Sequence, residues 1–328
     1  MAASKVTVLA YHRIAISSHP ADLSPALITS NPAAFEAQMR FVAARYNVIS
    51  SWDLVRALRD GKALPPRALI ITFDDGYRCF KDTALPILRR LNLPATLFVP
   101  TGYPGVPGRL FWWDAIHRAL TRTREPQIEV PGLGVLPLTT PAERRAAYDR
   151  LVPLVERTPE AAAGRLVESV VAQCKVEPNT VPHMLDWDEL AAVAEQGVDI
   201  GPHTREHIVL AQASPERVAA EVEGSWADLR ARIPRALPIF CYPTGKPHAI
   251  NRVAANAVRQ AGLAGAYTMV AGLNVVGQTN PYLLYRVGME GSDSVRTFAF
   301  KLTPAARAYR RVKGLVSPRA AAEFTFRQ

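Results

Sequence analysis

An uninterrupted apolar run that ends in two carboxylates constrains the fold of this chain more than any other feature. Residues 68–73, Ala-Leu-Ile-Ile-Thr-Phe, are followed directly by Asp74, Asp75 and Gly76. Such a run is typical of a strand buried on both faces, and Asp-Asp-Gly ends it with turn-forming residues. Buried parallel strands indicate an α/β fold, whose functional side chains lie at the carboxyl ends of the strands. The alternative is an ordinary turn in which an aspartate caps a helix over residues 81–91.

A second short strand ends near a pair of histidines. Residues 198–201, Val-Asp-Ile-Gly, are followed by Pro202, His203 and His207. On a helix this spacing places two imidazoles on one face, as in many zinc sites. Because the pair follows a strand and a proline, a turn with a short helix is the other interpretation. A lone histidine is usually a surface or packed residue. Two carboxylates and two imidazoles that both follow strands supply ligands for one divalent cation, and one carboxylate remains for proton transfer.

These segments resemble the polysaccharide deacetylases, also called NodB-homology carbohydrate esterases. Residues 72–77, Thr-Phe-Asp-Asp-Gly-Tyr, are similar to the first motif of that family, and residues 203–207, His-Thr-Arg-Glu-His, are similar to the second. A third motif, Arg-x-Pro-Tyr-Gly in the family, is matched loosely by residues 240–245, Phe-Cys-Tyr-Pro-Thr-Gly. The resemblance extends over residues 5–100 and 185–290. It implies an α/β fold, an irregular (β/α) barrel of the NodB-homology type with a helical insertion.

The same resemblance implies an activity, a cofactor and a division of roles. The expected enzyme is a metal-dependent hydrolase that removes an N-acetyl group from an amino sugar in a polysaccharide or a lipid-linked glycan precursor. Asp75, His203 and His207 are the implied ligands of one divalent metal ion, with Zn2+ as the first choice, although the set would also accept cobalt, nickel or iron. Asp74 is the implied base for the attacking water, and the backbone N–H of Thr244 matches the family's oxyanion donor.

One departure from the family concerns the group that orients the base. The third-motif arginine of the family aligns here with Cys241, and a cysteine cannot replace it. Arg286, an isolated cation at the end of an apolar stretch, is the candidate substitute. The alternative is an exposed arginine at a strand end.

The other departure concerns the acid that protonates the leaving amine. The family's C-terminal strand that ends in a catalytic histidine is absent, since no histidine follows His248. An apolar run that starts at Val6 and ends in His12 has the missing pattern. It resembles the circularly permuted branch of the family, which includes the poly-N-acetylglucosamine deacetylases, so His12 is the predicted acid. The alternative is a histidine that only caps or packs at a strand end.

Strand and helix patterns alternate along much of the chain, which predicts parallel strands covered by helices. Strands are expected over 6–12, 68–73 and 95–99, and helices over 32–46 and over 51–59, the latter with Ser51 as its N-cap. Residues 101–186 break this rhythm with a Gly- and Pro-rich loop, a possible hairpin around Pro131 and Gly132, and helices. We therefore expect four parts, namely 1–100 as the first part of the barrel, 101–186 as an insertion over the active-site face, 187–292 as the second part of the barrel, and 293–328 as a basic C-terminal tail.

Aromatic residues near these segments are candidates for substrate binding, because aromatic faces stack on sugar rings. Trp112 and Trp113 lie in the insertion, where they follow Phe111, and Tyr77 and Tyr242 lie beside the first and third motifs. The alternative for the insertion aromatics is ordinary packing.

Composition is consistent with one large α/β domain or a domain with an insertion, since 328 residues of which 48% are hydrophobic and 21% charged suffice for a full core. Three widely spaced cysteines form no disulfide framework and favour a reducing compartment. The first residues show no signal-peptide pattern, so we expect a cytoplasmic enzyme that acts on a precursor. A peripheral position at the inner face of the membrane is compatible with this expectation.

Part of the net charge of +10 comes from residues 301–328, which contain seven basic residues and only one acidic residue, Glu323. A helix over 305–316 with an apolar stripe between basic residues is consistent with peripheral contact with an anionic membrane, and a solvated helix packed on the body is the alternative. No nucleic-acid motif accompanies the charge, so no nucleic acid is expected as a partner.

Two other classes of function stay open on the sequence. One is an amidase that acts on a small linear or cyclic amide, which the loss of the third-motif arginine would suit. The other is a catalytically inactive glycan-binding protein. Asp74 argues against the second, because binding alone does not need a second carboxylate.

Overall fold

The structure is a computed structural model that describes residues 4–16, 22–306 and 308–309. It divides into two compact units. Of the described residues, those within 1–15, 28–105 and 184–328 form the first unit, and those within 16–27 and 106–183 form the second. The basic tail expected over 293–328 lies largely outside the described residues. Among the described residues, no helix has both the length and the apolar composition that a membrane span requires.

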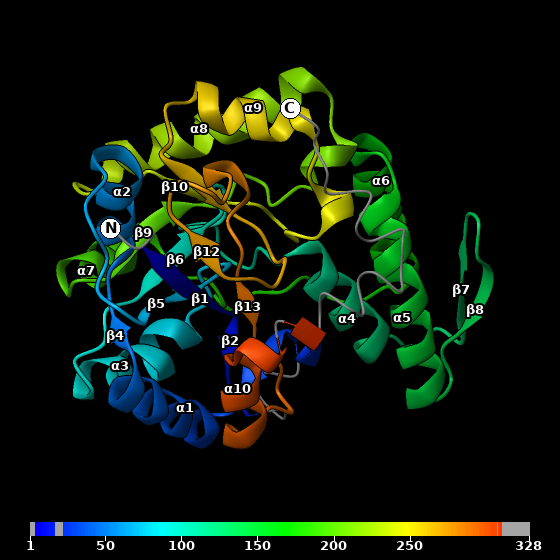
Figure 1. Ribbon diagram of the computed structural model, residues 1–328. Coiled ribbons are helices and arrows are strands. Elements are labelled where there is room, and N and C mark those ends of the chain that lie inside the picture. The colour runs from blue at the N-terminus through cyan, green and yellow to red at the C-terminus, as the bar shows by residue number, and fades with distance from the viewer. Residues whose placement is uncertain (1–3, 17–21, 307, 310–328) are drawn as a thin grey trace. The chain divides into compact units, whose positions relative to one another are not determined.

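The first unit is built on a curled, largely parallel sheet (Figure 1). Its central order is β12-β1-β5-β6-β9, with β13 also paired to β1 and β4 paired to β5; only the β1–β12 pair is antiparallel. The strands are β1 (Lys5–Tyr11), β4 (Asn47–Val48), β5 (Ala68–Phe73), β6 (Thr96–Val99), β9 (Asp199–Pro202), β12 (Asn274–Val275) and β13 (Val287–Gly288). Two further parallel pairs are β2 (Arg13–Ile14) with β3 (Ile28–Ser30), and β10 (Ile239–Cys241) with β11 (Gly265–Tyr267). The predicted irregular barrel is confirmed.

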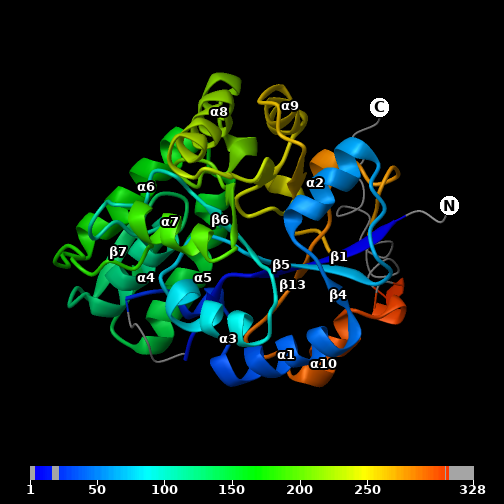
Figure 2. The ribbon, with the colours of Figure 1, turned by 90° about the vertical axis from the view of Figure 1, so that its left-hand side faces the viewer.

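Helices of the first unit cover this sheet. Figure 2 shows α1 next to α10 and α8 next to α9. The helices are α1 (Pro32–Arg45), α2 (Ser51–Asp60), α3 (Leu85–Arg90), α7 (Trp187–Glu195), α8 (Pro215–Arg232), α9 (Arg252–Gln260) and α10 (Val295–Lys301), with short 3-10 turns η3 (Leu210–Gln212), η4 (Pro247–Ala249) and η5 (Pro281–Leu283). All six residues of β5 are buried, as its apolar sequence predicts. From α1, Phe35, Met39 and Val42 pack into the same core.

Two local predictions in this unit are wrong. The N-cap of α2 is Ser50 rather than Ser51, because Ser50 forms a capping box with Asp53. Ser51 is instead buried, with its hydroxyl 2.6 Å from that of Thr96. The helix expected over 81–91 begins as a π-helical segment, η2 (Phe80–Ala84), and continues as α3, so the two aspartates of the motif do not cap it.

The second unit has its own core. Its elements are η1 (Pro25–Leu27), α4 (Trp112–Arg122), β7 (Gln127–Val130), β8 (Gly134–Pro137), α5 (Pro141–Arg157) and α6 (Glu160–Gln173). The hairpin predicted around residues 131–132 is confirmed as the antiparallel pair β7–β8. Ser24 joins this unit, since its N–H donates to Asp114 at 2.7 Å and its hydroxyl accepts from Tyr148 at 2.8 Å. The expected place of the insertion over the active-site face stays a prediction.

Candidate active site and metal centre

Strand register brings the first two candidate residues together. In the parallel pair β1–β5, Tyr11 is the partner of Phe73, so His12 and Asp74 follow at the same carboxyl edge. The backbone N–H of Asp74 extends this pairing by donating to the carbonyl of Tyr11 at 3.0 Å. Residues 62 positions apart in the chain therefore become neighbours because two apolar strands pair without a register shift.

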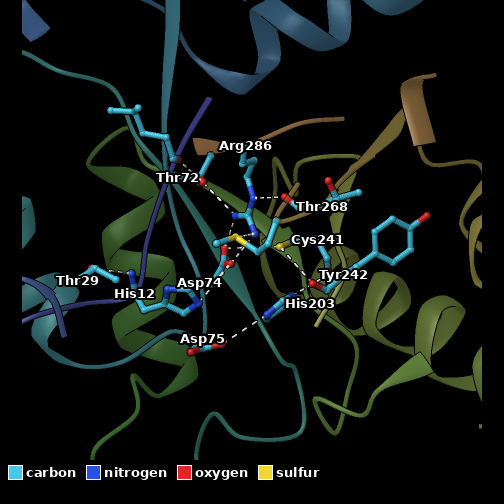
Figure 3. Close-up of polar contacts among 12 residues, drawn as sticks. His12, Thr29, Thr72, Asp74, Asp75, His203, Cys241, Tyr242, Thr268 and Arg286 are labelled. Atoms are coloured by element: carbon cyan, nitrogen blue, oxygen red, sulfur yellow. Dashed lines mark hydrogen bonds and ion pairs between the residues drawn. The ribbon is translucent and has the colours of Figure 1, made fainter. Parts of the chain in front are cut away.

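Asp75, His203 and His207 form a compact buried group. Figure 3 shows Asp75 and His203 facing each other beside Asp74. The Nε2 atoms of the two histidines lie 3.5 and 3.3 Å from Oδ1 of Asp75. These distances are long for a hydrogen bond, and this buried oxygen has no hydrogen-bond partner among the described residues. Ligand atoms of a tetrahedral zinc ion, bound at 2.0–2.2 Å, are separated by about 3.4 Å. The donor set and its spacing therefore fit one divalent cation.

Neighbouring groups prepare the two imidazoles for this role. Nδ1 of His203 lies 2.7 Å from the backbone carbonyl of Cys241, an acceptor only, so this nitrogen carries the proton and donates it. In the neutral ring the lone pair is then on Nε2, which faces Asp75, as second-shell partners commonly arrange in metal sites. Burial lowers the pKa of His203, but Cys241 and Asp75 outweigh it and raise this pKa, so a metal ion would have to displace the Nε2 proton. Burial lowers the pKa of His207, which favours the neutral ring that a metal requires.

The segment that carries the histidines is a loop, and the helical interpretations of residues 203–207 are wrong. Thr204 and His207 have φ of 66° and 52°, in the left-handed region. Asp75 likewise has a φ of 76°. Such backbone is unfavourable for residues other than glycine and is concentrated at functional sites, where surrounding contacts maintain it. The Thr204 hydroxyl contributes by accepting from the N–H of His207 at 2.9 Å.

Asp74 is held by a guanidinium. Both terminal nitrogens of Arg286 donate to Asp74, one to each carboxylate oxygen and each at 2.7 Å. Arg286 is fully buried, so the alternative of an exposed arginine at a strand end is wrong. Its other donors reach the Thr72 hydroxyl at 3.1 Å and the Thr268 carbonyl at 2.9 Å. Burial alone would raise the pKa of Asp74, but the charge of Arg286 outweighs it and the pKa lies below its usual value.

Cys241 lies on the other side of the same carboxylate. Its Sγ is 3.6 Å from Oδ1 of Asp74, and burial raises the pKa of its thiol. The thiol therefore stays protonated and acts as a weak donor. The position that aligns with the family's arginine thus contacts Asp74 as a neutral group, and the cation comes from the segment before β13.

His12 lies beside Oδ2 of Asp74. Its Nε2 is 3.8 Å from Oδ2 of Asp74, and its side chain is 19% exposed. The backbone N–H of His12 donates to the Thr29 hydroxyl at 3.1 Å, and Nδ1 of its ring has no hydrogen-bond partner among the described residues. The ring is thus partly open to solvent, next to Asp74.

Three other predicted residues lie in this unit. Thr244 follows β10 with a φ of 62°. Tyr242 is buried and donates its hydroxyl to the carbonyl of Tyr282 at 3.1 Å. Tyr77 is buried as well, with the guanidinium of Arg13 5.6 Å from its ring centre. The expected roles of these residues in catalysis and substrate binding stay predictions.

The insertion aromatics lie in the second unit. Phe111 and Trp113 are buried and stacked on each other, with ring centres 4.6 Å apart. Trp112 is half-buried and packs against the core of this unit. The packing alternative describes Phe111 and Trp113 well, and a sugar subsite at Trp112 and Trp113 stays a prediction.

Several residues of the site were not singled out from the sequence. Thr72 is the one polar residue in the apolar run before the motif, and that was an available signal. The carbonyls of Cys241 and Thr268 act through the backbone, so their side chains carried no signal.

Comparison with known proteins identifies a family. A family model described as polysaccharide deacetylase matches residues 61–125 and 141–266. A poly-beta-1,6-N-acetyl-D-glucosamine N-deacetylase from Escherichia coli K12 is 40% identical over 57 residues, which are 17% of this chain and only 8% of that protein.

Solved structures show the same fold. The deacetylase PplD from Streptococcus pyogenes, solved with acetate, matches with a TM-score of 0.60 and 17% identity, over 92% of this chain and 100% of that one. IcaB from Ammonifex degensii matches with a TM-score of 0.58 and 17% identity, over 92% and 98%. Because the family model covers more than half of the sequence, the chain belongs to the polysaccharide deacetylase family.

Proposed function

We propose that this protein is a metal-dependent hydrolase that removes an N-acetyl group from an amino sugar in a polysaccharide or a lipid-linked glycan precursor. The observation that supports this best is the pair of adjacent aspartates with different partners. Asp75 faces two imidazoles, whereas Asp74 is held by Arg286. A protein that only binds glycans would need neither the second carboxylate nor its buried counter-ion.

Asp75, His203 and His207 would hold the metal ion, with zinc as the first choice for two nitrogens and one oxygen. When bound there, the ion supplies a Lewis acid that polarises the acetyl carbonyl and makes a water easier to deprotonate.

Asp74 is the proposed base, and its contacts indicate which oxygen accepts the proton. Arg286 uses one lone pair on each carboxylate oxygen. Oδ1 also faces the Cys241 thiol, whereas Oδ2 faces the partly exposed ring of His12. Before the reaction Arg286 keeps the carboxylate ionised and oriented, and the free position on Oδ2 then takes the proton of the attacking water.

His12 is the proposed acid. Its Nε2, 3.8 Å from Oδ2 of Asp74, would deliver a proton to the amine as the C–N bond breaks. The backbone N–H of Thr244 is the proposed donor to the oxyanion, a role that the resemblance assigns and that needs no particular side chain.

Acetate release tests this function. Because the short match is to a poly-β-1,6-N-acetyl-D-glucosamine N-deacetylase, oligomers of β-1,6-linked N-acetylglucosamine are the first substrates to try. The expected result is acetate release that stops after chelation and returns with added zinc. Small linear and cyclic amides serve as the comparison, since turnover of these alone would favour an amidase. A metal-loaded protein that releases acetate from no glycan would contradict the proposal.

The lipid-linked form of the substrate is proposed from the charge of residues 301–328, which attracts an anionic membrane surface where such a glycan would lie. Removal of residues 310–328 should then reduce sedimentation with vesicles that contain phosphatidylglycerol, and acetate release from soluble oligomers should be unchanged. Equal sedimentation of both proteins would contradict membrane contact by the tail.

A further inference from the structure

The loop between the two histidines requires an external support. It joins His203 to His207, and two of its residues, Thr204 and His207, adopt left-handed backbone conformations. Non-glycine residues keep such conformations only where surrounding contacts impose them. The nitrogens that face Asp75 belong to the ends of this loop. Whatever maintains the loop therefore also maintains the positions of two proposed metal ligands.

Glu221 on α8 supplies the main buried contact. Its side chain is 0% exposed, and one oxygen, Oε2, accepts from the backbone N–H of Arg205 at 2.8 Å and of Glu206 at 2.9 Å. The other oxygen is paired with Arg217 at 3.0 Å. A buried carboxylate that accepts two backbone N–H bonds forms strong charge-assisted contacts. Here both bonds fix the middle of the histidine loop.

A second carboxylate on the same face of α8 binds the side chain of Arg205 in this loop. Asp228 lies two helical turns after Glu221 and accepts two hydrogen bonds from Arg205, each at 2.8 Å. Gly224 lies between them, where an added Cβ would come within 2.5 Å of the Arg205 guanidinium. The face of α8 is thus shaped to receive the loop.

The segment after β6 also supports the loop. The N–H groups of Thr101 and Gly102 donate to the carbonyls of Thr204 and Arg205 at 3.0 and 2.9 Å. The Thr101 hydroxyl also donates to Asp228 at 2.7 Å. Carbonyls of the loop are thus bonded to this segment, whereas its middle N–H groups are bonded to Glu221.

We infer that Glu221 is a positioning residue that holds His203 and His207 in their metal-binding arrangement before the metal arrives, and so sets the affinity for zinc. The inference rests on the proposed function, because it takes these histidines as ligands. Its physical basis is preorganisation: without the two N–H bonds, part of the metal-binding free energy would be spent on ordering the loop.

Substitutions at Glu221 separate its geometry from its charge. Glu221→Gln keeps an oxygen that can accept both N–H bonds, whereas Glu221→Asp withdraws the carboxylate by one methylene and Glu221→Ala removes it. Competition with a fluorescent chelator measures the Zn2+ affinity of each full-length protein. We expect the alanine and aspartate variants to bind Zn2+ about 10- to 100-fold more weakly, as when other outer-shell partners are removed, and the glutamine variant to bind nearly as well as the wild type.

Glu223 provides a matched control on the same helix. It is exposed, so Glu223→Ala makes a comparable change to α8 without touching the loop. A second readout uses the metal-free protein, in which the amides of Arg205 and Glu206 should exchange hydrogen faster in Glu221→Ala than in the wild type or in Glu223→Ala.

Wild-type Zn2+ affinity in both Glu221→Ala and Glu221→Asp would overturn the inference, even if these proteins were less stable. Should the alanine variant not fold, the aspartate and glutamine variants decide the question. If the wild type itself bound no Zn2+, both the proposed function and the inference would be wrong. The zinc titration of the wild type distinguishes this case from a failure of the inference alone.

Discussion

Asp74 and Asp75 are identical side chains in adjacent positions, and their neighbours give them different chemistry. Asp75 faces His203 and His207, whereas Asp74 is bound at both oxygens by Arg286. Burial would raise the pKa of each carboxyl, and in each case the neighbours outweigh it and lower the pKa. The proposed division into a metal ligand and a base therefore rests on contacts made by residues far away in the sequence.

Removal of Arg286 should show how strongly the buried charges of Arg286 and Asp74 stabilise each other. Arg286→Met leaves Asp74 buried without its counter-ion, and a change of this kind typically costs about 3–5 kcal/mol of unfolding free energy. Urea unfolding measures the loss. The double variant Arg286→Met with Asp74→Asn should regain much of it, because no unpaired charge remains. A single variant within about 1 kcal/mol of the wild type would mean that the pair is not coupled in this way.

Substitution of His12 tests the proposed acid. His12→Gln should lower kcat about 10²- to 10⁴-fold, the usual contribution of a positioned acid or base, and leave zinc binding intact because His12 is not among the ligands. The loss should be smaller for an acetamide whose leaving amine is less basic, since that amine needs less help from an acid. An equal loss for both kinds of substrate would contradict the assignment.

How far the sequence predicts these residues depends on whether their signal is local. The motifs contain Asp74, Asp75 and the two histidines in short segments, so the family resemblance could predict them together. Arg286 lies 212 positions from Asp74, and its place depends on the pairing of β13 with β1. Its isolation in an apolar stretch made it a candidate but could not show the contact.

At the scale of elements, the site residues lie just after the carboxyl ends of strands. The turns that follow these strands determine how the side chains are arranged. The buried strands could be predicted because apolar runs have a clear pattern. The turns could not, because Asp75, Thr204 and His207 adopt left-handed backbone that their residue types do not favour. The histidines lie four positions apart, which is typical of a helix. A strained loop can have the same spacing, so the spacing alone could not distinguish the two.

Gly76 tests the importance of one such turn. Its φ is 75°, and an added Cβ would touch Val99 at 3.4 Å. Gly76→Ala should cost about 1–2 kcal/mol in stability and also weaken zinc binding, because the turn places Asp75. The control is Gly197→Ala, where φ is 88° with no atom within 4 Å, so a similar loss of stability should leave zinc binding unchanged. Equal zinc affinity in the two variants would contradict a role of this turn in the site.

We expect Asp199, which joins β9 to α2, to make the free energy of unfolding depend on pH. Burial raises its pKa to about 6 from 3.8, although the Ser51 N–H donates to it at 2.9 Å. A carboxyl whose pKa is raised by folding favours the folded state when protonated, so its contribution is lost as pH rises from about 4 to about 6. Asp199→Asn keeps an acceptor and should raise the unfolding free energy at pH 7, by at most about 3 kcal/mol, with no gain at pH 4. A variant less stable than the wild type at pH 7 would contradict this.

At the scale of the whole molecule, the chain forms two units with separate cores. A change of rhythm after residue 100 predicted an insertion over residues 101–186, because this stretch does not continue the alternation of strands and helices. That domain boundary stays a prediction. The inclusion of residues 16–27 was not predictable. It depends on Ser24, which is hydrogen-bonded to Asp114, 90 positions away, and to Tyr148, 124 positions away. A single serine in a sequence gives no sign of such contacts.

The most direct test of the account is to measure bound zinc and acetate release on the same preparation of Asp74→Asn. We expect this variant to hold one zinc ion with wild-type affinity, because Asp75, His203 and His207 are unchanged. Its acetate release should fall about 10²-fold or more, because the base is lost. Turnover at the wild-type rate would contradict the role of Asp74. Loss of the zinc would contradict the division of the two aspartates into base and ligand.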